Sequence, residues 1–140
     1  MSASTQSILA LDIGDRRIGV ALADTVARLP QPLTVINRGR DCIDQIKHLV
    51  QQHAAVKLVA GLPRGLDGQQ TEQTRLTLAF IAELKSLISV PLELQDEALT
   101  SVLAEKELAG RRASYTRADI DALAAAYILQ DYLEGEAARV

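Results

Sequence analysis

The feature that most constrains this chain is a carboxylate inside its most apolar segment. Residues 8–13 read Ile-Leu-Ala-Leu-Asp-Ile, so Asp12 is the one polar residue in the run. A run of this kind is typical of a strand that is buried on both faces of a sheet. Burying an unpaired carboxylate costs several kcal/mol of folding free energy. Asp12 therefore either caps the following turn by accepting hydrogen bonds from residues 14–16, or serves a functional site.

Periodicity predicts the other elements. A turn at residues 14–17 and a strand at 18–23 form a hairpin with the first strand, and residues 33–36 predict a third strand near an edge. Helical spacing begins at Asp41, and residues 58–61 form a short buried strand before a polar loop at 62–69. The residues predicted on the buried side of the next, long helix are Thr77, Phe80, Ile81, Leu84, Leu87 and Ile88.

The last part of the chain predicts a strand at residues 91–95, a helix at about 100–108 and a final helix that begins after Thr116. Thr116 and Asp119 resemble a capping box with Asp in place of Glu. A leading meander followed by β-α-β crossovers predicts the α/β class, with a mixed sheet of five strands flanked by helices.

Three further acids stand at informative positions. Asp96 and Glu97 close a strand at its carboxyl end, where open α/β sheets bind their ligands. The structural alternative is that they match the positive end of the following helix. Asp121 precedes Ala125 and Ile128 by four and seven residues and therefore shares the apolar stripe of the last helix. Its structural alternative is an ion pair with Arg or Lys.

Taken together, these acids predict a metal site. Asp12, Asp96, Glu97 and Asp121 supply hard oxygen ligands of the type that Mg²⁺ or Mn²⁺ prefers. Two such ions can activate a water and stabilise the leaving oxygen of a phosphodiester. We therefore predict that Asp12, the Asp96–Glu97 pair and Asp121 hold the metal and carry the catalysis. The arginines that could bind nucleic acid around this site are Arg16, Arg17, Arg64, Arg111, Arg112 and Arg117.

Composition limits the other possibilities. The 140 residues are 48% hydrophobic and 24% charged, as expected for a single globular domain spanning residues 1–140. The net charge of −3 argues against a protein that coats nucleic acid nonspecifically. No apolar run reaches about eighteen residues, so no membrane span is expected. Residues 1–7 lack a secretory signal and predict a flexible terminus.

Cysteine and histidine content adds two expectations. Cys42 is the single cysteine, so an intrachain disulfide is excluded and a reducing cytoplasm is expected. It lies in an amphipathic helical segment and is expected either to pack or to lie at the surface, with no catalytic role. Zinc is not expected, because Cys42, His48 and His53 show no ligand spacing.

Four separated blocks resemble the YqgF/RuvX family, over about residues 8–133. They are Leu-Ala-Leu-Asp-Ile-Gly at 9–14 with Arg-Ile-Gly-Val-Ala at 17–21, Val-Ala-Gly-Leu-Pro at 59–63 with Asp-Gly at 67–68, Asp-Glu at 96–97 with Leu-Thr-Ser at 99–101, and Asp-Ala-Leu-Ala-Ala at 121–125 with Ile-Leu-Gln at 128–130. The resemblance implies an RNase H-like fold and a metal-dependent nuclease that matures the 5′ end of pre-16S ribosomal RNA. Asp12, the Asp96–Glu97 pair and Asp121 match the family's acids. With this match, Glu97 is favoured over Asp96 as the ligand, and Asp12, Glu97 and Asp121 are the expected catalytic residues.

The chain departs from the family pattern at three places. Ala98 replaces the Arg that usually follows the acid pair, and Asp15 stands where Thr is common. Residues 64–66 (Arg-Gly-Leu) differ from the usual loop. These departures concern substrate preference rather than the proposed ligands.

Three alternatives stay open. A resolvase acting on Holliday junctions would use the same metal chemistry, since only surface geometry distinguishes RNA from DNA. A non-catalytic module that binds RNA or the transcription machinery is a second. The first block also resembles the phosphate loop of actin-like ATPases, but those proteins need two lobes. Tyr115 is the one aromatic residue predicted to contact a base of the nucleic acid. The chain is expected to be a monomer or a homodimer.

Overall fold

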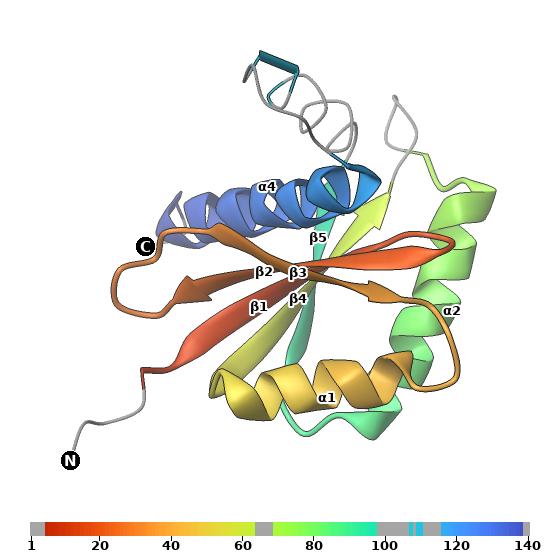
Figure 1. Ribbon diagram of the computed structural model, residues 1–140, viewed down its shortest axis with the longest axis horizontal. Coiled ribbons are helices and arrows are strands. Elements are labelled where there is room, and N and C mark those ends of the chain that lie inside the picture. The colour runs from red at the N-terminus through yellow and green to blue at the C-terminus, as the bar shows by residue number, and fades with distance from the viewer. Residues whose placement is uncertain (1–4, 64–68, 98–106, 108, 111–115, 139–140) are drawn as a thin grey trace.

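A computed structural model describes the chain except residues 1–4, 64–68, 98–106, 108, 111–115 and 139–140 (Figure 1). The elements are β1 (Ser7–Ile13), β2 (Arg17–Asp24), β3 (Gln31–Asn37), α1 (Cys42–Gln52), β4 (Ala55–Pro63), α2 (Glu72–Leu87), β5 (Leu92–Glu97) and α4 (Arg117–Ala138). Of the helix predicted at about 100–108, only Glu107 is among the described residues, where it is helical, and residues 64–68 of the predicted loop lie outside them. None of the described helices combines the length and hydrophobicity that crossing a bilayer requires.

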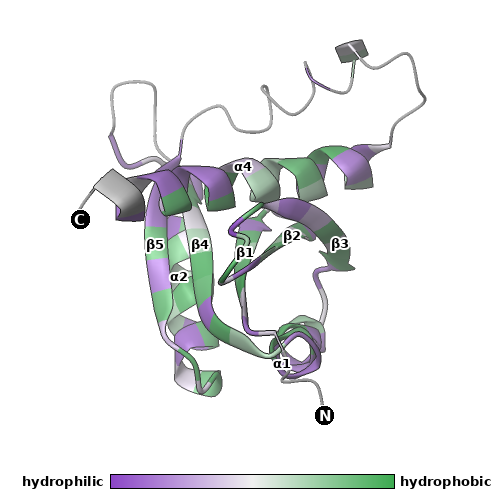
Figure 2. Cartoon of the chain, turned by 90° about the vertical axis from the view of Figure 1, so that its left-hand side faces the viewer, coloured by the Kyte–Doolittle hydropathy of each residue, from purple (hydrophilic) through white to green (hydrophobic). Residues whose placement is uncertain are grey.

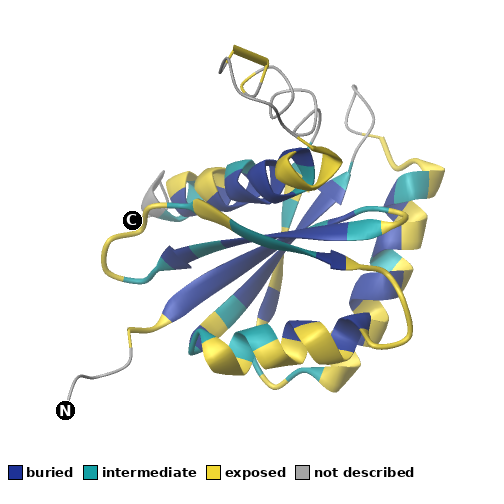
Figure 3. Cartoon of the chain, in the orientation of Figure 1, coloured by how far each residue is buried: buried dark blue, intermediate teal, exposed yellow. Residues whose placement is uncertain are grey.

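The five strands form one mixed sheet in the order β3-β2-β1-β4-β5. β1 pairs antiparallel with β2, which pairs antiparallel with β3, whereas β1 and β4 and then β4 and β5 pair in parallel. The predicted mixed sheet, hairpin and edge position of the third strand are thereby confirmed. β1 lies at the centre because it is apolar on both faces, and both faces are covered (Figure 3).

The two faces of β1 enter two separate cores. Leu9, Leu11 and Ile13 pack with α1 and α2, while Ile8 and Ala10 pack with α4. Successive strand residues point to opposite faces, which explains the division. α4 therefore covers one face and α1 and α2 the other (Figure 2).

α4 lies unusually close to the sheet. A Cβ added at Gly19 of β2 would overlap the backbone carbonyl of Asp121, and one added at Gly61 of β4 would overlap the side chain of Ile128. Small residues on the helix allow the same approach from its side: Ala122, Ala124, Ala125 and Ala126 are all buried. Thr116 begins the helix as predicted, since its Oγ1 accepts from the Asp119 N–H and its own N–H donates to the Asp119 carboxylate.

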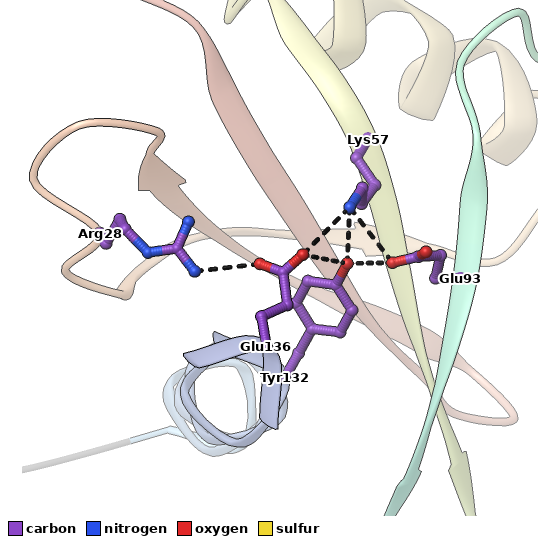
Figure 4. Close-up of polar contacts among 5 residues, drawn as sticks. All are labelled: Arg28, Lys57, Glu93, Tyr132 and Glu136. Atoms are coloured by element: carbon purple, nitrogen blue, oxygen red, sulfur yellow. Dashed lines mark hydrogen bonds and ion pairs between the residues drawn. The ribbon is translucent and has the colours of Figure 1, made fainter. Parts of the chain in front are cut away.

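A polar cluster, which we call the α4 clamp, fixes the far end of this helix (Figure 4). Lys57 Nζ donates to Tyr132 Oη at 2.6 Å and forms ion pairs with Glu93 and Glu136 at 3.3 and 3.4 Å. Tyr132 Oη contacts both carboxylates, and Glu136 also pairs with Arg28 at 3.0 Å. The clamp joins α4 to β4, β5 and the turn after β2.

Two predicted boundaries and one predicted buried position are wrong. Ser7 belongs to β1 and not to a flexible terminus, because it is buried and its Oγ donates to the His53 carbonyl. Leu62 and Pro63 continue β4, since β5 extends the ladder alongside them. Leu87 is 49% exposed, because Leu84 is the last buried residue of α2 and the helix ends at Leu87. Of the two positions considered for Cys42, packing and surface, the structure shows packing in the core.

Candidate metal and nucleic-acid site

The strand acids lie at one edge of the sheet. Asp12 stands near the carboxyl end of β1, and Glu97 is the last residue of β5. Because β1, β4 and β5 run in parallel, their carboxyl ends meet at the same edge. This is the edge where open α/β sheets bind ligands.

Strand alternation decides which acids face α4. Asp12 follows Ala10, which packs on α4, and therefore points toward that helix. Glu97 shares its face of β5 with Glu93, whose carboxylate contacts Tyr132 of α4. Asp96 alternates with Glu97 and falls on the opposite face, so Glu97 is the member of the pair on the same side as Asp12.

Asp121 reaches the site from α4 and is held there by Arg17. The close approach of the helix backbone at Gly19 is the cause, since Gly19 is paired with Asp12 across the β1–β2 ladder. Arg17 Nε donates to Asp121 Oδ2 at 2.6 Å, with both side chains partly exposed. The ion pair that we considered as the structural alternative for Asp121 is therefore present.

The environment of Asp12 disfavours its charged form. Burial, followed by the charge of Asp121, raises the pKa of Asp12 to about 6. The turn does not use this carboxylate, because the Gly14 N–H donates to the Arg17 carbonyl at 2.9 Å. Within the described residues, the geometry thus removes the capping explanation for Asp12.

The pKa of Glu97 is raised further than that of Asp12. Burial, contact with Asp131 and the charges of Asp12 and Asp96 raise the pKa of Glu97 to about 9. Its Oε1 atom is buried and has no hydrogen-bond partner among the described residues. Asp131, on α4, is a neighbour that sequence reasoning missed. It lies ten residues after Asp121, which is not a helical repeat, so no periodicity indicated it.

The acids are neighbours without forming a closed cage. In the part of the chain that the structure describes, no three His, Cys, Asp or Glu side chains converge closely enough to hold an ion as they stand. The donor chemistry nevertheless fits a hard divalent cation: carboxylate oxygens that repel one another, one of them buried without a partner.

Three of the predicted arginines meet beside this site. Gly14, Asp15, Arg16, Arg17, Arg117 and Asp121 line an open hollow of about 520 Å³. Arg64, Arg111, Arg112 and Tyr115 lie outside the described residues. The hollow thus joins the turn after β1 to the first turn of α4.

Comparison with known proteins identifies the chain. The RuvX family model, described as "Holliday junction resolvase", matches residues 6–135. The chain belongs to the RuvX family. Its relatives include a protein of Chloroflexus aurantiacus, 45% identical over 133 residues, covering 92% of this chain and 87% of the relative. A Roseiflexus protein is 38% identical over 140 residues, covering 97% and 99%. Both are named "Putative pre-16S rRNA nuclease".

Solved structures place this RuvX chain among RNase H-like folds. The RuvC protein of T. thermophilus, solved in complex with a Holliday junction substrate, superposes with a TM-score of 0.56 at 14% identity, covering 94% of this chain and 96% of RuvC. The fowlpox virus resolvase, in complex with junction DNA, gives a TM-score of 0.52 at 10% identity, covering 93% and 98%. The predicted fold class is confirmed.

Proposed function

We propose that this RuvX chain is a metal-dependent nuclease that hydrolyses a phosphodiester bond of structured nucleic acid, with the 5′ end of pre-16S ribosomal RNA as its substrate. The observation that carries the proposal is the placement of Asp12. It lies at the edge of the sheet where the carboxyl ends of the parallel strands meet, on the side of α4, and burial, followed by the charge of Asp121, raises its pKa. The names of the relatives support the choice of RNA.

Asp12, Glu97 and Asp121 are the residues that would hold Mg²⁺ or Mn²⁺, and two ions are expected. A bound ion would neutralise their mutual repulsion and lower the pKa of an attacking water. The ion pair with Arg17 uses Oδ2 of Asp121, so the other carboxylate oxygen remains available among the described residues. Glu97 would contribute Oε1, which is buried and has no hydrogen-bond partner among the residues that the structure describes.

The chain's own residues prepare this chemistry by position. Gly19 brings Asp121 to Asp12, and the end of β5 directs Glu97 to the same side. Deprotonation of Asp12 and Glu97 is unfavourable without a counter-ion, and a cation bound between them would offset that cost.

The direct test compares two substrates. Purified protein is incubated with a precursor ribosomal RNA fragment carrying the 5′ extension, or with a four-way DNA junction, in Mg²⁺, Mn²⁺ or EDTA. We expect cleavage of the RNA with either metal, none in EDTA, and none by Asp12→Asn with its fold intact. Wild-type cleavage by Asp12→Asn contradicts the proposal.

The substrate arms distinguish the alternatives. Symmetrical cutting of the junction alone would identify a resolvase instead. Binding of either substrate without metal-dependent cleavage would identify a non-catalytic module. The expectation of a monomer or homodimer, and of a cytoplasmic location, stays a prediction.

A further inference from the structure

The arginine-lined hollow beside the acids has an excess of positive charge. Of its two acids, Asp121 is paired with Arg17. Arg16 and Arg117 are exposed, and neither forms an ion pair within the described residues. Asp15 is the other acid on the wall, so two unpaired guanidinium groups face one unpaired carboxylate.

Hydrogen bonds hold the backbone that carries these groups. The turn that carries Asp15 and Arg16 is closed by the bond from the Gly14 N–H to the Arg17 carbonyl. Arg38 supports the same turn, because its N–H donates to the Arg16 carbonyl at 2.8 Å and its guanidinium donates to the Gly14 carbonyl at 3.1 Å. Arg117 is the first residue of α4, so it projects from the positive end of the helix. The wall opposite the turn is therefore also electropositive.

We infer that this hollow binds a backbone phosphate of the nucleic-acid strand, next to the phosphodiester that is cut, and that Asp15 limits its affinity. The inference rests on the proposed nuclease function, because Asp121 lines the hollow and belongs to the proposed metal site. Arginine presents several N–H donors in a plane that matches phosphate oxygens. A carboxylate at position 15 repels the same ligand, so this chain carries a built-in penalty on binding.

Binding is measured separately from cleavage. A fluorescein-labelled stem-loop RNA is titrated by fluorescence anisotropy in EDTA at several salt concentrations. Arg16→Gln and Arg117→Gln are each expected to weaken binding about threefold to tenfold. The slope of log K against log salt concentration should become shallower by roughly 0.7 to 0.9 per lost phosphate contact. Asp15→Asn keeps a turn-forming residue and is expected to tighten binding severalfold.

Lys85→Gln is the matched control. Lys85 is exposed in the last turn of α2, whereas the chain enters α2 from the carboxyl end of β4, on the side of the site. Replacing Lys85 removes the same single positive charge. We expect no change in the salt dependence for this variant. Thermal unfolding of each variant shows that its fold is retained.

Several outcomes overturn the inference. Wild-type binding by Arg16→Gln and Arg117→Gln does so, as does equal weakening by Lys85→Gln. Unchanged or weaker binding by Asp15→Asn removes the role of Asp15, and a wild-type protein that does not bind the RNA removes the subsite altogether. Inorganic phosphate and a mononucleotide are also tested as competitors of the labelled RNA. If both displace it at the same concentration, and an unlabelled RNA strand competes no better, the hollow is a site for free phosphate instead.

The two proposals fail separately. If the arginine variants bind normally while Asp12→Asn abolishes cleavage, the nuclease stands and the subsite falls. If Asp12→Asn still cleaves but the arginine variants bind weakly, the subsite stands and the metal assignment falls.

Discussion

Gly19 and the backbone of Asp121 touch across the interface between β2 and α4, at a distance that excludes any side chain at position 19. Gly19 is also the cross-strand partner of Asp12. One hydrogen atom in place of a side chain therefore lets an acid from the last helix lie beside an acid from the first strand.

Gly19→Ala should push α4 away from the sheet. Because the atom it meets is backbone and not a flexible side chain, we expect a loss of about 3 kcal/mol in the free energy of unfolding. Gly135→Ala is the control. Its added Cβ meets nothing within 4 Å, and alanine favours a helix interior, so a gain of about 0.5–1 kcal/mol is expected. Urea unfolding measures both, and equal stabilities would contradict the close approach.

Asp12→Asn should stabilise the protein without metal while it removes cleavage. The wild-type carboxylate has its pKa raised from 3.8 to about 6, so its charged form at pH 7.5 is disfavoured by the fold. The neutral amide avoids that cost, and we expect a gain of about 1–3 kcal/mol in EDTA. Denaturant unfolding in EDTA checks the sign, and a destabilised variant would show that Asp12 has a structural role.

Without metal, the wild-type protein should lose stability as pH rises. A carboxyl group with a raised pKa contributes its full stability below its unfolded pKa and loses it as pH passes the folded value. For Asp12 this interval runs from 3.8 to about 6, and for Glu97 from 4.5 to about 9. Melting temperatures in EDTA from pH 4 to 9 should therefore fall across this range.

Added Mn²⁺ should counter that loss, since the ion binds the deprotonated acids. At a hundredfold excess over Kd we expect about 2.7 kcal/mol of stabilisation. The melting temperature of the wild type at pH 7.5 should rise with Mn²⁺ and return with EDTA. An unchanged melting temperature at saturating Mn²⁺ argues against a metal site here.

Glu97→Gln and Asp96→Asn form a matched pair of neighbouring neutralisations. Glu97 faces α4 with a buried oxygen, whereas Asp96 alternates to the other face. We expect Glu97→Gln to weaken Mn²⁺ binding at least about tenfold, the range found when a metal shell is disturbed, and Asp96→Asn to leave it nearly unchanged. Isothermal titration calorimetry distinguishes them, and the reverse ranking would assign the ligand to Asp96.

Lys57→Met should weaken the α4 clamp. Without the ammonium group, Glu93 and Glu136 lie near each other and near Tyr132 with no central cation. Since both ion pairs are partly exposed, we expect a loss of only about 1 kcal/mol. Arg75→Gln removes an exposed pair with Glu72 at 2.8 Å and should change stability by less than about 0.5 kcal/mol. Urea unfolding compares the two, and equal losses would mean that the clamp contributes nothing beyond a surface pair.

Much of the site was predictable from residues close together in the chain. The apolar run around Asp12 indicated a central strand, and the helical stripe placed Asp121 toward the sheet. Both follow from burial and from repeats of about 2.0 and 3.6 residues, which are properties of a single segment. The structure confirms these elements.

The neighbours of the acids were not predictable in this way. Arg17 was expected to bind nucleic acid, yet it pairs with Asp121, 104 residues later in the sequence. Asp131 was not expected near Glu97 at all. Such contacts depend on how α4 crosses the sheet, and no local pattern encodes a crossing.

The sequence by itself determined the order of the elements, the place of Asp12 on an apolar strand and membership of the family, because each depends on residue type and local spacing. Only the tertiary structure decided that Asp12 and Glu97 share the α4 side while Asp96 does not. Alternation along one strand fixes which residues share a face, but not which face a helix covers. Here α4 covers the face on which Gly19 and Gly61 let a helix approach the sheet closely.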